Sequence, residues 1–252
     1  MSTKPFGLLL SALTLAACGD SDGAPNDTNN LPSPSDDIKD TGNDTDVPED
    51  TDVPEDTSAA YTFSDKDSLL YVQVFKDPDT LLSGFAHNHV IRATKWSGSL
   101  VYDIENPSAG ELAFTLPVRS LVVDEDNMRS LVGYGDSLSS SDRETITGHM
   151  LDTTQLNGSK FGKIEFSSTT CSGPKGANSG QLNVQGKLKV MGIPVAVSIP
   201  VDFNIQNERF YATGAFDMSM WDFGMEPYSA FGGGVRNKEE LYYSFDMVGA
   251  EN

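Results

Sequence analysis

Apolar and polar residues alternate along much of the second half of the chain. Residues 184–190 carry apolar side chains at alternate positions, and residues 195–204 repeat the pattern. Because successive side chains of a β-strand point to opposite faces, each run predicts a strand with one buried face and one wet face. The short segment between them, residues 191–194, predicts that the two strands form a hairpin.

Runs of the same kind recur along the chain. They lie at residues 70–75, 98–104, 112–118, 163–170, 210–220 and 241–247. Many short strands in series, separated by turn residues, are typical of an antiparallel sandwich or barrel.

The alternation fails in residues 124–157. Residues 141–144 read Ser-Asp-Arg-Glu, the pattern of a helix capping box, and the apolar residues Ile146, Met150 and Leu151 follow. This pattern predicts a short inserted helix. We expect its apolar face to lie against the sheet and to cap one end of a barrel.

The first residues are typical of an export signal. A lone Lys4 precedes an apolar run over residues 6–15, and Leu-Ala-Ala-Cys ends at Cys18. The run is shorter than the roughly 20 apolar residues that span a bilayer, and the order of charge, apolar run and small residues is that of a signal peptide. Leu-Ala-Ala-Cys resembles the lipobox of bacterial lipoproteins. We therefore expect a signal peptide over residues 1–17 and a lipid anchor at Cys18; the alternative is an ordinary secretory signal with a chance cysteine.

Residues 18–60 are interpreted as an acidic, disordered linker. Asp, Pro, Asn, Ser and Thr dominate them, and Asp-Val-Pro-Glu-Asp-Thr occurs twice in succession. Such a segment buries too little apolar surface to offset the entropy of ordering it. We expect a solvated spacer that holds a domain away from a membrane of the bacterial cell envelope, on its periplasmic side or at the cell surface.

Residues 61–252 make up one domain. The linker carries most of the chain's net charge of −20, and the domain keeps a negative balance. A negative surface disfavours nucleic-acid binding, which needs clustered Lys and Arg. Cys171 is left without a partner if Cys18 is lipidated, so no disulfide is expected.

Two of the three histidines, His87 and His89, lie in the apolar stretch at residues 83–93. If residues 84–91 are extended, both rings share one face with Phe85 and Ile91. They then have three possible roles: structural hydrogen bonding, contact with a ligand head group at the mouth of a barrel, or metal binding, which needs a third or fourth ligand. Three acids in the interrupting segment, Asp124, Asp126 and Asp136, are interpreted as solvated loop residues.

The chain offers little support for catalysis. Ser, His and Asp are present, but no Gly-x-Ser-x-Gly turn occurs. An all-β fold also lacks the strand–turn–helix on which that turn sits. We expect a protein that is not an enzyme.

Four motifs in series resemble the YceI-like, lipocalin-like family associated with polyisoprenoid binding. They lie at residues 151–161, 164–168, 186–195 and 221–224, the last reading Trp-Asp-Phe-Gly. Gly162 and Met220 depart from the usual pattern of the family. The resemblance implies an all-β fold, an extended eight-stranded antiparallel barrel with an apolar interior. It also implies an apolar ligand, such as an isoprenoid, a quinone-like lipid or a fatty chain.

The expected ligand contacts combine the histidine stretch with the inward faces of the predicted strands. They are His87, His89, Phe114, Val195, Val197, Ile199, Phe216 and Tyr243. The resulting prediction is a membrane-anchored protein that sequesters or carries an apolar small molecule, with no required cofactor. Two alternatives stay open: a metal-binding protein or metal-dependent enzyme that uses His87 and His89, and a structural lipoprotein with a solid barrel.

Overall fold

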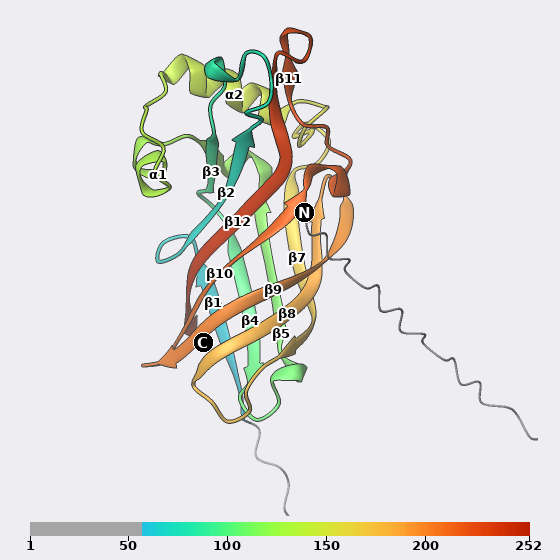
Figure 1. Cartoon of the computed structure of the whole chain (residues 1–252). Helices are drawn as coiled ribbons and strands as arrows, with labels where there is room; N and C mark the ends of the chain where they lie inside the picture. The colour runs from blue at the N-terminus through green and yellow to red at the C-terminus, as the bar shows by residue number, and fades with distance from the viewer. Residues whose placement is uncertain (1–56) are drawn as a thin grey trace, which may run out of the picture. The chain divides into compact units, whose positions relative to one another are not determined.

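A computed structural model describes residues 57–252, which form an antiparallel β-barrel with helices at one end (Figure 1). The expected signal peptide, Cys18 and nearly all of the expected linker lie outside the described residues. The first strand begins at Ser58, shortly before the expected domain start at Tyr61.

The barrel is a meander of eight antiparallel strands, of which the first three are each bent into two segments. The bent strands are β1 (Ser58–Ser64) with β2 (Leu69–Lys76), β3 (His89–Ala93) with β4 (Ser97–Asp103), and β5 (Glu111–Pro117) with β6 (Leu121–Val123). The other five are β7 (Lys163–Ser172), β8 (Ser179–Val190), β9 (Ile193–Gln206), β10 (Arg209–Ser219) and β12 (Val235–Glu251). A short β11 (Ser229–Ala230) pairs with the start of β12.

The last strand closes the barrel against the first. Lower in Figure 1, β12 pairs with β1 through Tyr61 and Glu251, and higher up the same edge of β12 pairs with β2 through Val74 and Leu241. Every neighbouring pair is antiparallel. The predicted eight-stranded barrel is thus confirmed.

The predicted hairpin between β8 and β9 shows how the sequence fixes the register. Val190 pairs with Ile193, and the two residues between them, Met191 and Gly192, have φ angles of 51° and 78°. Positive φ at both central positions is the geometry of the two-residue turn that matches the twist of paired strands. Along β8 and β9 buried and exposed side chains alternate, as the period-two pattern predicts.

Two helices occupy the segment that interrupts the alternation. They are α1 (Asp126–Leu131), which the sequence does not predict, and α2 (Ser140–Leu151). The cap of α2 is Ser139, whose side chain accepts a hydrogen bond from Asp142 N. The predicted capping box at residues 141–144 is therefore two residues too late, because three consecutive serines compete for the role.

The described part of the chain also has five 3₁₀ turns. These are η1 (Ser83–Phe85), η2 (Pro107–Ala109), η3 (Val118–Ser120), η4 (Met220–Phe223) and η5 (Phe231–Gly233). Residues 84–91 are not extended throughout, since η1 occupies the start of this stretch and β3 begins only at His89, so the condition under which both histidines share one face with Phe85 and Ile91 is not met. Two hydrogen bonds hold the start of this stretch as a loop: Leu82 N donates to Gly234 O, and the Lys76 side chain donates through Nζ to Ser83 O.

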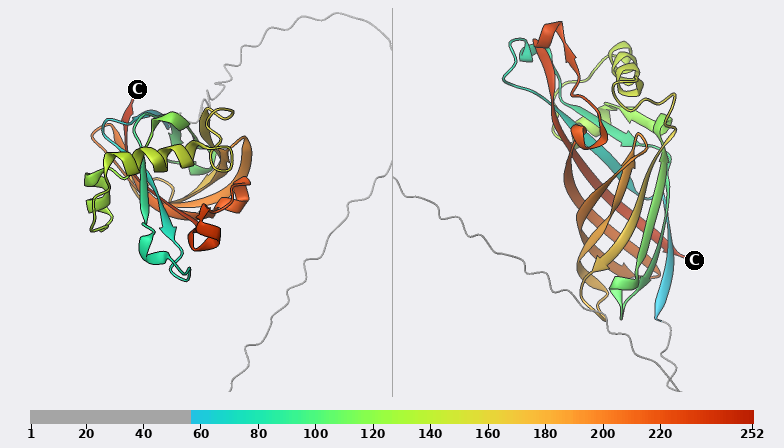
Figure 2. Two further views of the ribbon diagram at one scale, coloured as in Figure 1. Left: turned by 90° about the horizontal axis from the view of Figure 1, so that it is seen from above. Right: turned by 90° about the vertical axis from the view of Figure 1, so that its right-hand side faces the viewer.

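The two ends of the barrel are closed differently. At the lower end Tyr61, Tyr102, Phe203 and Phe210 pack with ring centroids 5.4–5.7 Å apart. At the upper end α2 lies across the barrel when it is viewed from above (Figure 2). No helix within residues 57–252 is long and apolar enough to cross a membrane.

Candidate functional site

The space inside the barrel is the first candidate site. A cavity of about 170 Å³ extends between the lower aromatic cluster and α2. A dry cavity of about 150 Å³ lined by apolar side chains is large enough to bind benzene. The barrel is therefore not solid, and in this conformation it admits a small apolar group. A long chain needs some of the lining side chains to move.

The aliphatic and aromatic wall comes from the inward positions of the strands. Four of the eight expected ligand residues lie in it: Phe114, Ile199, Phe216 and Tyr243. The three aromatic residues of this set take part in two stacked pairs. Phe114 stacks on Phe166 with 5.2 Å between ring centroids, and Phe216 stacks on Tyr243 with 4.9 Å. The wall thus combines aliphatic side chains with two flat aromatic pairs.

Val195 and Val197 face the inside of the barrel but do not reach the cavity. Both are half-buried and pack against the core. Val197 pairs with Gly186, and the ring of Phe166 fills the space above this glycine: a Cβ placed on Gly186 would lie 2.5 Å from Phe166 Cζ. An inward glycine beside a strand aromatic is the sequence signal for this arrangement.

The upper wall of the cavity comes from α2 and the segment after it. Met150 and Leu156 line the cavity, and Ile146 and Leu151 pack against the core, which confirms that the apolar face of the helix lies against the barrel. Two contacts fasten this segment to the loop after η4. Gln155 Nε2 donates to Glu226 O at 2.6 Å, and His149 stacks on Tyr228 at 4.7 Å. We call residues 140–156 the cover of the cavity.

Tyr102 and Cys171 are the buried polar groups at the lower end. Burial raises the pKa of Tyr102 to about 12, and it also raises the pKa of the Cys171 thiol. Tyr102 Oη has no hydrogen-bond partner among the described residues and is closed off by its neighbours. Cys171 is reduced and buried, so at ordinary pH both groups stay neutral.

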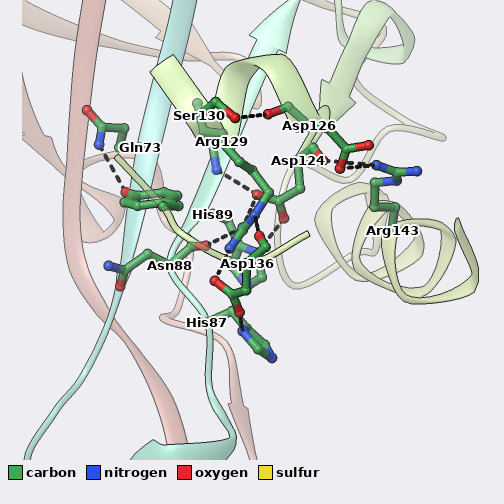
Figure 3. Close-up of polar contacts among 12 residues, drawn as sticks. Gln73, His87, Asn88, His89, Asp124, Asp126, Arg129, Ser130, Asp136 and Arg143 are labelled. Carbon is green, nitrogen blue, oxygen red and sulfur yellow. Dashed lines mark hydrogen bonds and ion pairs between the residues drawn. The ribbon is translucent and has the colours of Figure 1, made fainter. Parts of the chain in front are cut away.

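A polar cluster outside the cavity contains both histidines (Figure 3). His89 Nδ1 lies 2.6 Å from Asp124 Oδ2, and His87 Nδ1 lies 3.1 Å from Asp136 Oδ2. Between the two acids lies Arg129, which donates to Asp124 Oδ1 and to Asp136 Oδ1, each at 2.9 Å. Neither histidine lines the cavity, because each ring is held by a carboxylate of the loop around α1.

Asp124 is not the solvated loop acid that we expect from the sequence. Its side chain is fully buried, and Val90 N donates to Oδ1 at 3.0 Å. Burial by itself would raise the pKa of Asp124, but the hydrogen bonds from His89, Val90 and Arg129 outweigh it and hold this pKa below its ordinary value. Its φ of 53° turns the chain sharply from β6 toward α1. Asp126 and Asp136 are exposed, as expected.

The arrangement favours a structural role for this cluster. Arg129 is buried, donates also to Asn88 O and lies 5.4 Å over the ring of Tyr134, so it ties α1 to β3. Nothing in the local pattern singles out Arg129, although Asp124 and Asp136 lie only five and seven residues away; of its hydrogen-bond partners, only Asn88 O is distant in sequence. Within residues 57–252 no group of three or more His, Cys, Asp or Glu is placed to hold a metal ion.

Comparison with known proteins agrees with the barrel. The profile of the YceI-like domain matches residues 75–247. Among solved structures, BcnA from Burkholderia cenocepacia is 16% identical with a TM-score of 0.51, and the match covers 72% of this chain and 95% of that one.

A polyisoprenoid binding domain from Saccharophagus degradans, implicated in plant cell wall breakdown, is 11% identical with a TM-score of 0.52. The match covers 77% of this chain and 99% of that domain. At these identities the two structures establish a shared fold. The comparison with curated proteins gave no match.

Proposed function

This chain belongs to the YceI-like domain family, and on that premise we propose that it is a non-catalytic protein that holds an apolar small molecule inside its barrel. The observation that carries the proposal is the cavity between the aromatic cluster and α2, whose wall is almost wholly apolar. Burial of apolar ligand surface in such a cavity is favoured by roughly 25 cal/mol per Å².

The extent and the width of the cavity favour a slender, chain-like ligand. The cavity runs from Phe210 near the lower end to Met150, which belongs to the cover. A barrel of eight strands has an interior just wide enough for side chains or one small ligand. The solved relative described as a polyisoprenoid binding domain supports a ligand of the isoprenoid class, to which quinone-like lipids also belong.

We further propose that the protein is exported and anchored to a bacterial membrane through lipidated Cys18. The support is the order of Lys4, the apolar run and Leu-Ala-Ala-Cys at the start of the chain. An anchored barrel on an acidic tether would take up and release its ligand close to a lipid surface, where isoprenoid chains partition.

Native mass spectrometry of the full-length protein, with extraction and identification of any retained lipid, tests the binding proposal. The matched variants are Ala212→Leu, which fills the cavity from β10, and Ala196→Leu, which adds the same side chain on the exposed face of β9. We expect the first to lose most of the retained lipid and the second to keep it. A wild-type protein that retains no lipid and binds no added isoprenoid would contradict the proposal.

A further inference from the structure

Few polar side chains face the cavity, and most of them are occupied or closed off. Gln155 donates to Glu226 O, and Ser168 Oγ accepts a hydrogen bond from Leu112 N. Tyr102 Oη is sealed by its neighbours, so a ligand in the cavity does not reach it. Two tyrosines, Tyr71 and Tyr243, remain. The side chain of Tyr71 alternates on β2 with the inward-facing Leu70 and Val72 and so points away from the cavity interior, which leaves the hydroxyl of Tyr243.

Tyr243 projects from the middle of β12 into the cavity. It pairs with Phe216 on one side and with Val72 on the other, and its ring stacks on Phe216 with an angle of 6° between the ring planes. The residue is half-buried, and burial raises the pKa of its phenol well above the ordinary value. The phenol is therefore neutral and keeps its proton to donate.

The hydroxyl of Tyr243 is unpaired but not sealed. No described residue forms a hydrogen bond with it. Within residues 57–252, the buried unpaired side-chain atoms without accessible surface are Trp96 Nε1 and Tyr102 Oη. The Tyr243 hydroxyl therefore keeps some accessible surface. Because Tyr243 lines the cavity, we infer that the accessible space next to its hydroxyl is the cavity itself.

A pure hydrocarbon chain fits this wall poorly at one point. It would cover the Tyr243 hydroxyl without offering it a partner, and a buried hydroxyl without a hydrogen bond is unfavourable. A chain that carries an oxygen at this level removes the penalty and gains a hydrogen bond in a site that excludes water.

We propose that the ligand is an isoprenoid-like chain bearing a hydrogen-bond-accepting oxygen, a carbonyl or a hydroxyl, and that Tyr243 donates to this oxygen. The inference rests on the proposed function, since it assigns a ligand group to the same cavity. It also moves the polar contact of the ligand from His87 and His89, which bind Asp136 and Asp124, to the inside of the barrel.

Three probes with one carbon skeleton test it: farnesene, farnesol and farnesal, a hydrocarbon, an alcohol and an aldehyde. Binding to the full-length protein is measured by calorimetric titration for the wild type, Tyr243→Phe and Tyr242→Phe. We expect Tyr243→Phe to lose about two- to tenfold in affinity for farnesol and farnesal and nothing for farnesene, as the loss of one hydrogen bond predicts. Tyr242→Phe removes the same hydroxyl at the neighbouring position of β12, which does not line the cavity, and should leave all three affinities unchanged.

A second measurement does not depend on the folding of a variant. The carbonyl stretch of farnesal bound to the wild-type protein should lie at lower frequency than in hexane, because a donated hydrogen bond weakens the C=O bond. An unshifted stretch, or a Tyr243→Phe variant that affects all three probes equally, would overturn the role of Tyr243 while leaving the binding function intact. Failure of the wild type to bind any of the three would instead overturn both.

Discussion

His89 Nδ1 lies 2.6 Å from Asp124 Oδ2 and joins the first residue of β3 to the turn that follows β6. The same carboxylate accepts hydrogen bonds from Val90 N and from Arg129, so one buried acid holds β3, the turn and α1 together. The histidine that attracts attention in the sequence thus serves to fix the upper edge of the barrel.

Removal of this acid should destabilise the protein strongly. In Asp124→Ala, the buried Arg129 loses its buried partner and keeps only the exposed Asp136, and His89 and Val90 N lose theirs. Breaking a buried ion pair in this way costs about 3–5 kcal/mol. Urea unfolding measures the loss. The control is Asp126→Ala, an exposed acid paired with Arg143, which should change stability by less than ~1 kcal/mol. Equal effects of the two substitutions would contradict the role of Asp124.

The free energy of unfolding should also decrease as the pH falls into the acid range. The hydrogen bond from Arg236 lowers the pKa of Asp77, and for Asp124 the bonds from His89, Val90 and Arg129 lower the pKa despite its burial. The pKa of an unfolded Asp is about 3.9, so these groups contribute their full stability above that pH and lose it as the pH falls through their lower folded values. Urea midpoints measured from pH 6 to pH 2.5 should drop below about pH 4, and less steeply in Asp124→Asn. A wild-type midpoint that stays constant over this range would refute the prediction.

Gly186→Ala should reduce both stability and ligand capacity. Its Cβ would lie 2.5 Å from Phe166 Cζ and 2.6 Å from Ser167 O, so the ring must move toward the cavity or the strands must part. Overpacking of this kind costs about 1–3 kcal/mol. Thermal unfolding and lipid retention measure the two effects. Gly148→Ala in α2, where the new Cβ meets nothing within 4 Å, should instead stabilise by roughly 0.5–1 kcal/mol.

Cys18→Ser should release the protein from membranes. Without the thiol no lipid can be attached at this position, so the full-length chain should move from the membrane fraction to the soluble fraction and should no longer incorporate labelled palmitate. Cys171→Ser is the matched control, since Cys171 is buried inside the barrel and should have no effect on partition. A Cys18→Ser variant that still sediments with membranes would rule out the proposed anchor.

The strands could be predicted from the sequence because period-two alternation is a local property. Runs such as residues 195–204 reveal their inward face without knowledge of any partner, and the positive-φ pair Met191 and Gly192 fixes a register over two residues. The first strand is harder to find: Tyr61 and Phe63 are its only fully buried side chains, and it follows directly on the polar linker.

The polar cluster could not be predicted because it depends on partners that lie far apart in the chain. From the sequence alone, Asp124 is interpreted as a solvated loop acid. Its partners His89 and Val90 lie 35 and 34 residues away, and only the fold brings them beside it. The cavity is a similar case. Alternation predicts that Val197 and Phe216 both face inward, but only the three-dimensional packing shows that Phe216 reaches the cavity and Val197 does not.

The pairing of β1 with β12 makes closure of the barrel the last step available to a growing chain. Thr62 Oγ1 donates to Asn252 Oδ1 across 190 residues, and Tyr61 can pair with Glu251 only after β12 has been made. Contacts so distant in sequence form slowly, because the entropy of closing the loop is lost before the contact is made. A chain cut short before β12 therefore lacks more than one strand: its curved sheet keeps two unpaired edges and an uncovered apolar face, the features that lead partly made β-proteins to aggregate.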